Sequence, residues 1–264
     1  MKIADYLKLH DDIVEWIHTY TQTNNIESLV VGLSGGIDSA VVAMLCIDMV
    51  QTYKDVRVIC VMMPYDISDA ESYARSLKFK RNVEFFGADA DFYTHEIKSI
   101  VNAYDLDRYS GYKQNILSGN LRARVRANIL YDVAGATNGI VVGTGNLDEN
   151  ELGYFTKGGD GLTDILPIGN LHKYEVYELA KVFMIDIPQE IINATPSANL
   201  WEGQTDEDEL GMTYNEVAWA IDTITGHDSV LSTPEPTRAA EVLARVKEMQ
   251  KKTEHKRRMP PVFR

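Results

Sequence analysis

Residues 34–39 read Ser-Gly-Gly-Ile-Asp-Ser, and this short segment decides how the chain is organised. It follows SLVVGL at 28–33, which is typical of a buried strand, and it precedes AVVAMLCIDMV at 40–50, which predicts a helix that is apolar nearly all round. The first N–H groups of a helix lack partners, and glycines let the backbone approach phosphate oxygens. The segment therefore predicts a phosphate-binding loop between a strand and a helix.

Asp38 distinguishes this loop from the better-known phosphate loop, which ends in Gly-Lys-Ser/Thr. Here no lysine is present, and the Asp38 carboxylate would repel a polyphosphate unless a divalent cation lay between them. The alternative is a purely structural turn in which Asp38 caps the helix. That alternative leaves the two serines and two glycines without a role, so we expect Mg²⁺ at this loop.

Strand and helix patterns alternate on both sides of the loop. Strands are predicted at 28–33, 56–64, 83–89 and 139–146, and helices at 11–22, 40–50, 69–79, 92–104 and 120–138. This alternation predicts an α/β fold with a doubly wound parallel sheet and helices on both faces. Patterns at 173–184, 213–224 and 235–252 predict additional C-terminal helices, and DEDE at 206–209 predicts a solvated loop or a first helical turn.

Composition limits the function classes. The chain has 264 residues and a formal net charge of -13, which disfavours nonspecific binding to nucleic acid or to an anionic membrane. Its length suits a single domain over 1–264. Cys46 and Cys60 lie in apolar segments and predict reduced core thiols. No apolar run reaches the roughly 18 residues of a membrane helix, so we expect a cytoplasmic protein.

The loop at 34–39 resembles that of the N-type ATP pyrophosphatases, which cleave ATP to AMP and pyrophosphate while adenylating a substrate. Segments at 120–126, 143–180, 195–217 and 253–261 make the resemblance more specific; they begin NLRARVR, GTGNLDENELGYFTKGGDG, TPSANLWEG and TEHKRR. Together they are similar to ammonia-dependent NAD synthetase over nearly the whole chain. That resemblance implies an adenine nucleotide alpha hydrolase-like fold, no glutaminase domain and a homodimer.

The activity that the resemblance implies is ATP-dependent amidation of nicotinic acid adenine dinucleotide (deamido-NAD) by ammonia, the final step of NAD biosynthesis. A carboxylate of deamido-NAD would attack the α-phosphate of ATP, and ammonia would then displace AMP. Two alternatives stay open: another N-type ATP pyrophosphatase, either an adenylating ligase or a tRNA-modifying enzyme, and a nucleotide-binding module without turnover. The acidic net charge and the two apolar-segment cysteines disfavour a tRNA enzyme.

The resemblance also implies roles for individual residues. ATP would contact Gly32, Leu33, Ser34, Gly35, Gly36, Ile37, Asp38, Ser39, Thr144, Lys173 and Ser197. Deamido-NAD would contact Arg124, Lys157, Asp160, Asp164, His255 and Lys256. Asp38 and Glu149 would hold Mg²⁺, since two carboxylates suit a hard ion that keeps several waters. Lys173 would stabilise charge that develops at the phosphates, and with the two acids it completes the catalytic set.

Two arginines lie in an apolar stripe of the helix predicted at 120–138. Leu121, Val125 and Ile129 share one helical face, and Arg122 and Arg126, four residues apart, fall within that face. Both arginines could extend to solvent at the rim. The interpretation that we favour here places them at a subunit interface, where they would pair with acids or substrate phosphates of the other chain.

Overall fold

The structure, a computed structural model, describes residues 3–66, 69–104, 114–197 and 205–263. Within these ranges the centre is a parallel sheet of four strands in the order β3-β2-β1-β4. The strands are β1 Ser28–Gly32, β2 Arg57–Met62, β3 Asp91–Thr94 and β4 Gly139–Val142. Because β2 and β3 lie on one side of β1 and β4 lies on the other, the predicted doubly wound sheet is confirmed.

The two faces of the sheet belong to different hydrophobic cores. Leu29 and Val31 of β1 enter one core, whereas Val30 between them enters the other. This alternation follows from the period of two of a strand, and it explains why SLVVG is apolar without interruption. Both strand faces are therefore covered by helices.

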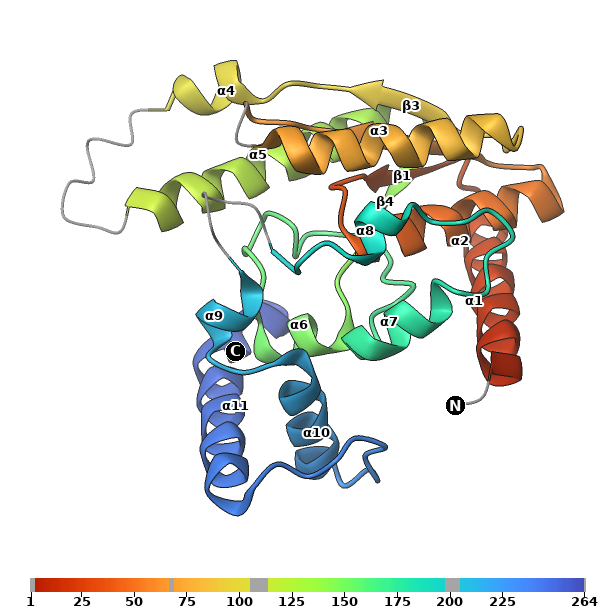
Figure 1. Cartoon of the computed structure of the whole chain (residues 1–264). Coiled ribbons are helices and arrows are strands. Elements are labelled where there is room, and N and C mark those ends of the chain that lie inside the picture. Colours follow the sequence, from red (N-terminus) through yellow and green to blue (C-terminus); the bar gives the residue numbers. More distant parts are fainter. Residues whose placement is uncertain (1–2, 67–68, 105–113, 198–204, 264) are drawn as a thin grey trace.

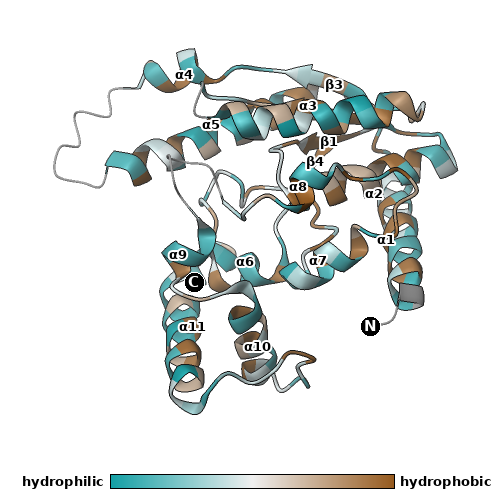
Figure 2. Ribbon diagram, in the orientation of Figure 1, coloured by the Kyte–Doolittle hydropathy of each residue, from teal (hydrophilic) through white to brown (hydrophobic). Residues whose placement is uncertain are grey.

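Helices cover both faces (Figure 1). On one face lie α1 Ile3–Asn24, α2 Ile37–Tyr53, α3 Ala70–Phe85, α7 Lys173–Leu179 and α8 Gln189–Ile192. On the other lie α4 Lys98–Asn102 and α5 Gln114–Ala136. The hydrophobic colour in Figure 2 covers most of α2, as expected for a helix that packs against the sheet and against other helices.

The C-terminal helices form a third core beside the carboxyl end of the sheet. This unit, which stands below the sheet in Figure 1, consists of α6 Leu147–Leu152, α9 Asp206–Leu210, α10 Tyr214–Thr225 and α11 Pro236–Arg257. Arg238 of α11 donates to both carboxylate oxygens of Glu216 on α10, at 2.6 and 2.8 Å. In the described ranges no helix is long and apolar enough to cross a membrane.

The third strand is not where the sequence predicts it. Residues 83–89 are not a strand, because α3 continues to Phe85 and buries Val83 one turn after Phe79. The true third strand is β3, which takes Phe92, Tyr93 and Thr94 from the helix predicted at 92–104. β3 is an edge strand whose residues are half-buried or exposed, so it lacks the apolar run that identifies a buried strand.

Two acidic or glycine-rich segments also differ from the prediction. The run at 206–209 is the first turn of α9, yet Asp206 is buried rather than solvated. The glycine-rich segment after the strand predicted at 139–146 contains α6, where no helix is predicted. The part of the 195–217 segment at 198–204 lies outside the described residues.

The contrast between Phe79 and Phe85 provides a test of the extended α3. The Phe79 side chain is 1% exposed, whereas that of Phe85, six residues later in the same helix, is 84% exposed. Phe79→Ala should lower the free energy of unfolding by about 3–5 kcal/mol, because it empties a core position. Phe85→Ala should change it by about 0.5 kcal/mol or less. Urea unfolding measures both; equal losses would mean that residues 83–89 pack differently.

Candidate active site

The phosphate loop lies between β1 and α2 and is held by its own hydroxyl groups. The Ser34 N–H donates to Ser39 Oγ at 3.2 Å, and Ser39 Oγ donates to the Gly36 carbonyl at 3.0 Å. Gly35 has a φ of +81°, and a Cβ there would lie 2.1 Å from the carbonyl oxygen of Ser72. Only glycine fits this position, because both the backbone angle and the close approach exclude a side chain. The turn at Gly35 brings the two serine hydroxyls together, with Ser34 Oγ 3.0 Å from Ser39 Oγ.

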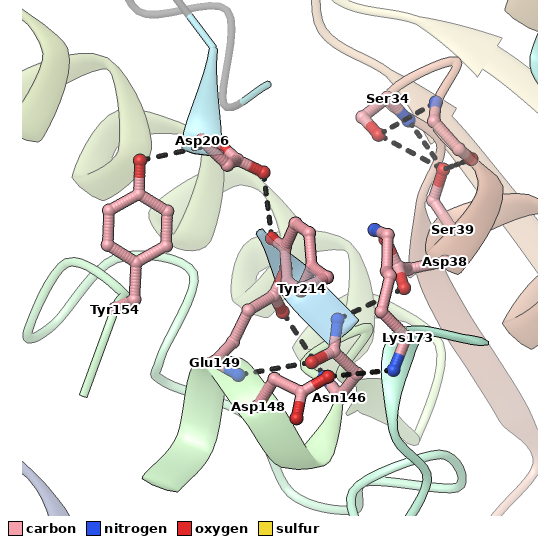
Figure 3. Close-up of polar contacts among 11 residues, drawn as sticks. Ser34, Asp38, Ser39, Asn146, Asp148, Glu149, Tyr154, Lys173, Asp206 and Tyr214 are labelled. Atoms are coloured by element: carbon pink, nitrogen blue, oxygen red, sulfur yellow. Dashed lines mark hydrogen bonds and ion pairs between the residues drawn. The ribbon is translucent and has the colours of Figure 1, made fainter. Parts of the chain in front are cut away.

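Asp38, in the first turn of α2, contacts two polar groups from the C-terminal half of the chain (Figure 3). Its Oδ2 forms an ion pair with Lys173 Nζ, and its Oδ1 accepts a hydrogen bond from Asn146 Nδ2 at 3.2 Å. Lys173, the first residue of α7, is only 4% exposed. Burial lowers the pKa of Lys173, but the carboxylates of Asp38 and Glu149 outweigh it and raise this pKa above its ordinary value. The two acids thus favour the charged form of the buried Lys173 side chain.

Glu149 is tied to the same place through a capping box at the start of α6. The Glu149 N–H donates to Asn146 Oδ1 at 3.0 Å, and the Asn146 N–H donates to Glu149 Oε2 at 3.2 Å. Burial and the neighbouring Asp38 charge raise the pKa of Glu149 well above its usual range. Two carboxylates held close together in a buried place favour a cation between them.

Asn146 is a residue that the sequence reasoning missed. It is fully buried, and its side chain bonds both Asp38 and Glu149. The signal for it was present, since Asn followed three residues later by Glu before an apolar residue is typical of a helix start. The segment GTGNLDE contains this pattern at 143–149.

A third acid, Asp206 of α9, was also missed, and it lies near the other two (Figure 3). Tyr214 OH donates to its Oδ2 at 2.9 Å, and Tyr154 OH donates to its Oδ1 at 3.3 Å. Burial raises the pKa of Asp206, while the hydrogen bond from Tyr214 lowers it. The Lys173 amine lies 5.2 Å from the centre of the Tyr214 ring. Asp206 and Tyr214 thus connect the C-terminal helices to the site.

Asp38, Glu149, Lys173 and Asp206 line one cavity of about 790 Å³, a size typical of a small-molecule site, whereas Asn146 and Tyr214 are not part of its lining. The predicted ATP-binding residues that line it are Gly32, Leu33, Ser34, Gly36, Ile37, Asp38, Ser39, Thr144, Lys173 and Ser197. Glu149 lines it as well, and so do Asp160, His255 and Lys256 from the predicted deamido-NAD set. The structure therefore brings together residues predicted from segments up to 224 positions apart in the sequence (Gly32 to Lys256).

Four predicted residues do not line this cavity: Gly35, Arg124, Lys157 and Asp164. Asp164 accepts a hydrogen bond from the Val141 N–H at 2.7 Å, so one of its oxygens supports the end of β4. Arg124 Nε donates to the Lys157 carbonyl at 3.2 Å, and Lys157 Nζ donates to the His255 carbonyl at 3.0 Å. Arg124 and Lys157 are thus adjacent, exposed and outside the lining of the cavity.

Asp160 and Lys256 lie on the cavity wall but are partly engaged by the backbone. Asp160 Oδ1 accepts from the Thr156 N–H at 2.9 Å, and burial raises the Asp160 pKa. Lys256 Nζ donates to the carbonyls of Gly153 and Phe155 at 2.8 and 2.6 Å. These contacts fasten the end of α11 to the loop after α6.

The structure gives both α5 arginines partners within their own chain, and their contact with a second subunit stays a prediction. The Arg126 guanidinium pairs with Asp69 of the same chain at 2.9 Å and donates to the Met63 carbonyl at 3.0 Å. The Arg122 guanidinium stacks 3.5 Å from the centre of the Tyr65 ring. Arg126 therefore finds its acid within the subunit, at the residue that precedes α3, a partner that the spacing of the α5 stripe could not reveal.

The carboxylates of Asp38 and Glu149 are suitable ligands for a Mg²⁺ ion that is also bound by a nucleotide. Among the described residues, no group of three or more His, Cys, Asp or Glu side chains is placed to hold a metal ion. Two carboxylates, Asp38 and Glu149, stand beside a phosphate loop, and Mg²⁺ characteristically takes one or two carboxylates and completes its shell with waters and substrate phosphates. The residues present thus suit an ion that arrives with a nucleotide.

Comparison with known proteins supplies the family. A family model described as NAD synthase matches residues 9–260. The NH(3)-dependent NAD(+) synthetase of Carboxydothermus hydrogenoformans is 40% identical over 96% of this chain and 95% of its own length. Among solved structures, NMN synthetase from Francisella tularensis is 34% identical, with a TM-score of 0.81, and covers 99% of this chain and 98% of its own.

A second structure agrees with these. The NH3-dependent NAD synthetase from Campylobacter jejuni is 27% identical, with a TM-score of 0.77, and the match covers 100% of both chains. The family model and the relatives therefore cover the phosphate loop, the Asp38 and Glu149 carboxylates and the C-terminal helices alike. The chain belongs to the NAD synthase family.

Proposed function

We propose that the protein is an ATP-dependent, ammonia-using NAD synthetase that converts deamido-NAD into NAD, AMP and pyrophosphate. The observation that carries the proposal is the meeting of Asp38, Lys173, Asn146 and Glu149 at the phosphate loop. A buried cation beside a phosphate loop suits adenylyl transfer, because it can stabilise the charge that develops as pyrophosphate leaves, whereas nucleotide binding alone gives it no such role. The match of the family model over residues 9–260 supports a single synthetase domain.

The reaction divides into two displacements, both by substrates. A carboxylate oxygen of deamido-NAD forms a bond to the α-phosphorus of ATP, and the bond from that phosphorus to the bridging oxygen breaks to release pyrophosphate. Ammonia then adds to the acyl carbon, the bond to the adenylate oxygen breaks to release AMP, and the added nitrogen loses one proton to solvent to leave the amide. No protein nucleophile is needed, so positioning and charge stabilisation carry the rate.

The chain's own residues would contribute as follows. The N–H groups and hydroxyls of the loop at 34–39 bind the phosphates, and Lys173 stabilises negative charge as pyrophosphate leaves. Asp38 and Glu149 would hold Mg²⁺, which when bound neutralises phosphate charge. The walls from α9 and α11 would exclude water, which protects the acyl adenylate from hydrolysis.

The first test is the product balance. Purified protein supplied with ATP, Mg²⁺, deamido-NAD and ammonium should form NAD, AMP and pyrophosphate in equal amounts, because the loop lacks the lysine that serves γ-phosphoryl transfer. Ammonia-free glutamine should give no NAD, since both cysteines are buried in core elements and cannot serve as a glutaminase nucleophile. Chromatography of the nucleotides decides both points; accumulation of ADP would refute the mechanism.

A second substrate is favoured by one observation. The solved structure of the Francisella tularensis relative is described as an NMN synthetase, and its TM-score with this chain is 0.81. Nicotinic acid mononucleotide presents the same carboxylate as deamido-NAD. The same assay should therefore be run with the mononucleotide, and the kcat/KM values of the two substrates compared. A higher kcat/KM for the mononucleotide would reassign the substrate while leaving the chemistry unchanged.

A double-mutant cycle tests whether Asp38 and Glu149 share one ion. Asp38→Asn and Glu149→Gln should each lower kcat/KM roughly a hundredfold or more, because metal-assisted charge neutralisation weakens. Once one carboxylate is gone the other has less to do, so the two losses should be non-additive by about 1 kcal/mol or more. The assay is kcat/KM against Mg²⁺ concentration for all four proteins. Additive losses would remove Glu149 from the metal site.

We further propose a homodimer in which the deamido-NAD site lies partly between subunits. Its support is the position of Arg124 and Lys157, which adjoin each other outside the cavity and would meet a substrate shared with a second chain. Analytical ultracentrifugation should give about twice the chain mass of 29.7 kDa. A monomer that remains fully active on dilution would contradict the shared site. The free, buried thiols of Cys46 and Cys60 support a reducing compartment such as the cytoplasm.

A further inference from the structure

His172 immediately precedes α7 and joins three elements of the structure. Its Nδ1 lies 2.6 Å from Asp148 Oδ1 on α6, and its Nε2 lies 3.2 Å from Asp222 Oδ1 on α10. The residue is 5% exposed, and Asp148 is fully buried. None of these three side chains touches the phosphate loop or belongs to the proposed metal-binding or substrate-binding set.

Asp148 connects this histidine to the reacting centre. Its second oxygen, Oδ2, accepts a hydrogen bond from the backbone N–H of Lys173 at 2.8 Å, and Figure 3 shows this contact beside the Asn146 side chain. Lys173 is the first residue of α7, and Glu149 follows Asp148 in the first turn of α6. One carboxylate thus links the starts of the two helices that supply Lys173 and Glu149.

The charges favour a bridge in which His172 holds Asp148 and Asp222 together, and we call these three side chains the clamp. Burial lowers the pKa of His172, but the hydrogen bonds to Asp148 and Asp222 outweigh this and raise the pKa to about 9. A protonated His172 donates from both nitrogens and lies between the fully buried Asp148 and the partly buried Asp222. A ring bonded at both ends cannot rotate freely, so it fixes the orientation of Asp148.

We propose that His172 is a positioning residue, which orients Asp148 so that the Lys173 amine stays aligned on Asp38 and on the phosphates of ATP. The proposal rests on the proposed role of Lys173 in ATP chemistry. Its physical basis is the sensitivity of phosphoryl transfer to geometry, since a displacement of about 1 Å at a reacting group can cost on the order of a hundredfold in rate.

His10 provides a matched control elsewhere in the molecule. Its Nδ1 and Nε2 each lie 2.9 Å from a carboxylate, those of Asp11 and Asp48, and its ring packs edge-on against Phe183. It joins α1 to α2 and does not line the cavity. His10→Gln and His172→Gln therefore remove the same kind of two-carboxylate bridge, one remote from Lys173 and one next to it.

The experiment compares three properties of the wild-type protein, His172→Gln and His10→Gln. These are the melting temperature, kcat and KM for ATP in NAD formation, and the acetylation rate of Lys173 by acetic anhydride, read by mass spectrometry. His172→Gln should lower kcat about tenfold or more with a smaller change in KM for ATP, since alignment rather than binding is lost. It should also raise acetylation of Lys173. His10→Gln should lower the melting temperature without either change.

Three outcomes would overturn the proposal: an unchanged kcat with wild-type acetylation in His172→Gln, an equal kcat loss in His10→Gln, or a loss confined to KM. If His172→Gln does not fold, Asp222→Asn removes the outer acid and keeps the Asp148 contact. It should then show a smaller kcat loss in the same direction, and wild-type kcat in that variant would also refute the clamp. A wild-type protein that forms no NAD would refute the proposed function instead, whereas acetylation of Lys173 reports on the clamp without turnover.

Discussion

The ion pair between Asp38 and Lys173 joins residues 135 positions apart, and the arrangement of the active site depends on it. Asp38 comes from the phosphate loop side of the sheet, and Lys173 begins a helix that follows the long glycine-rich segment. A buried ammonium group is costly unless acids surround it, so the chain must bring Asp38 and Glu149 to Lys173 for the fold to be stable. The requirement for stability and the requirement for catalysis thus coincide at one place.

The surrounding structure satisfies every member of this cluster. Asn146 uses both ends of its amide, one on Asp38 and one on Glu149, and Tyr214 covers Lys173 with its ring. A partly satisfied buried network would destabilise the protein and would not hold a defined geometry. The C-terminal helices are therefore part of the site rather than an appendage, because Tyr214 and Asp206 belong to them.

The sequence predicts the central features of this protein because they have local signals. Residues 28–50 contain a buried strand, a glycine-rich turn and an apolar helix in order, and the structure confirms all three. The edge strand at 91–94 could not be predicted, because its residues are half-exposed and carry no apolar run. The acid partner of Arg126 was missed for a related reason, since Asp69 lies 57 positions away and only the tertiary fold brings the two together. Asn146 and Asp148 lie at the start of a helix and contact residues that are distant in the sequence. Only the capping pattern around them could have indicated their role from the sequence.

The proposed function requires that the substrate carboxylate be activated as an acyl adenylate at the phosphate loop. Transfer of an oxygen isotope reports on this step: deamido-NAD labelled with ¹⁸O in its carboxylate is converted with ATP and ammonium, and the nucleotide products are analysed by mass spectrometry. Because AMP leaves with one oxygen of the carboxylate, we expect ¹⁸O in the phosphate of AMP and none in pyrophosphate. Unlabelled AMP formed together with NAD, or ¹⁸O in pyrophosphate or inorganic phosphate, would exclude the acyl adenylate.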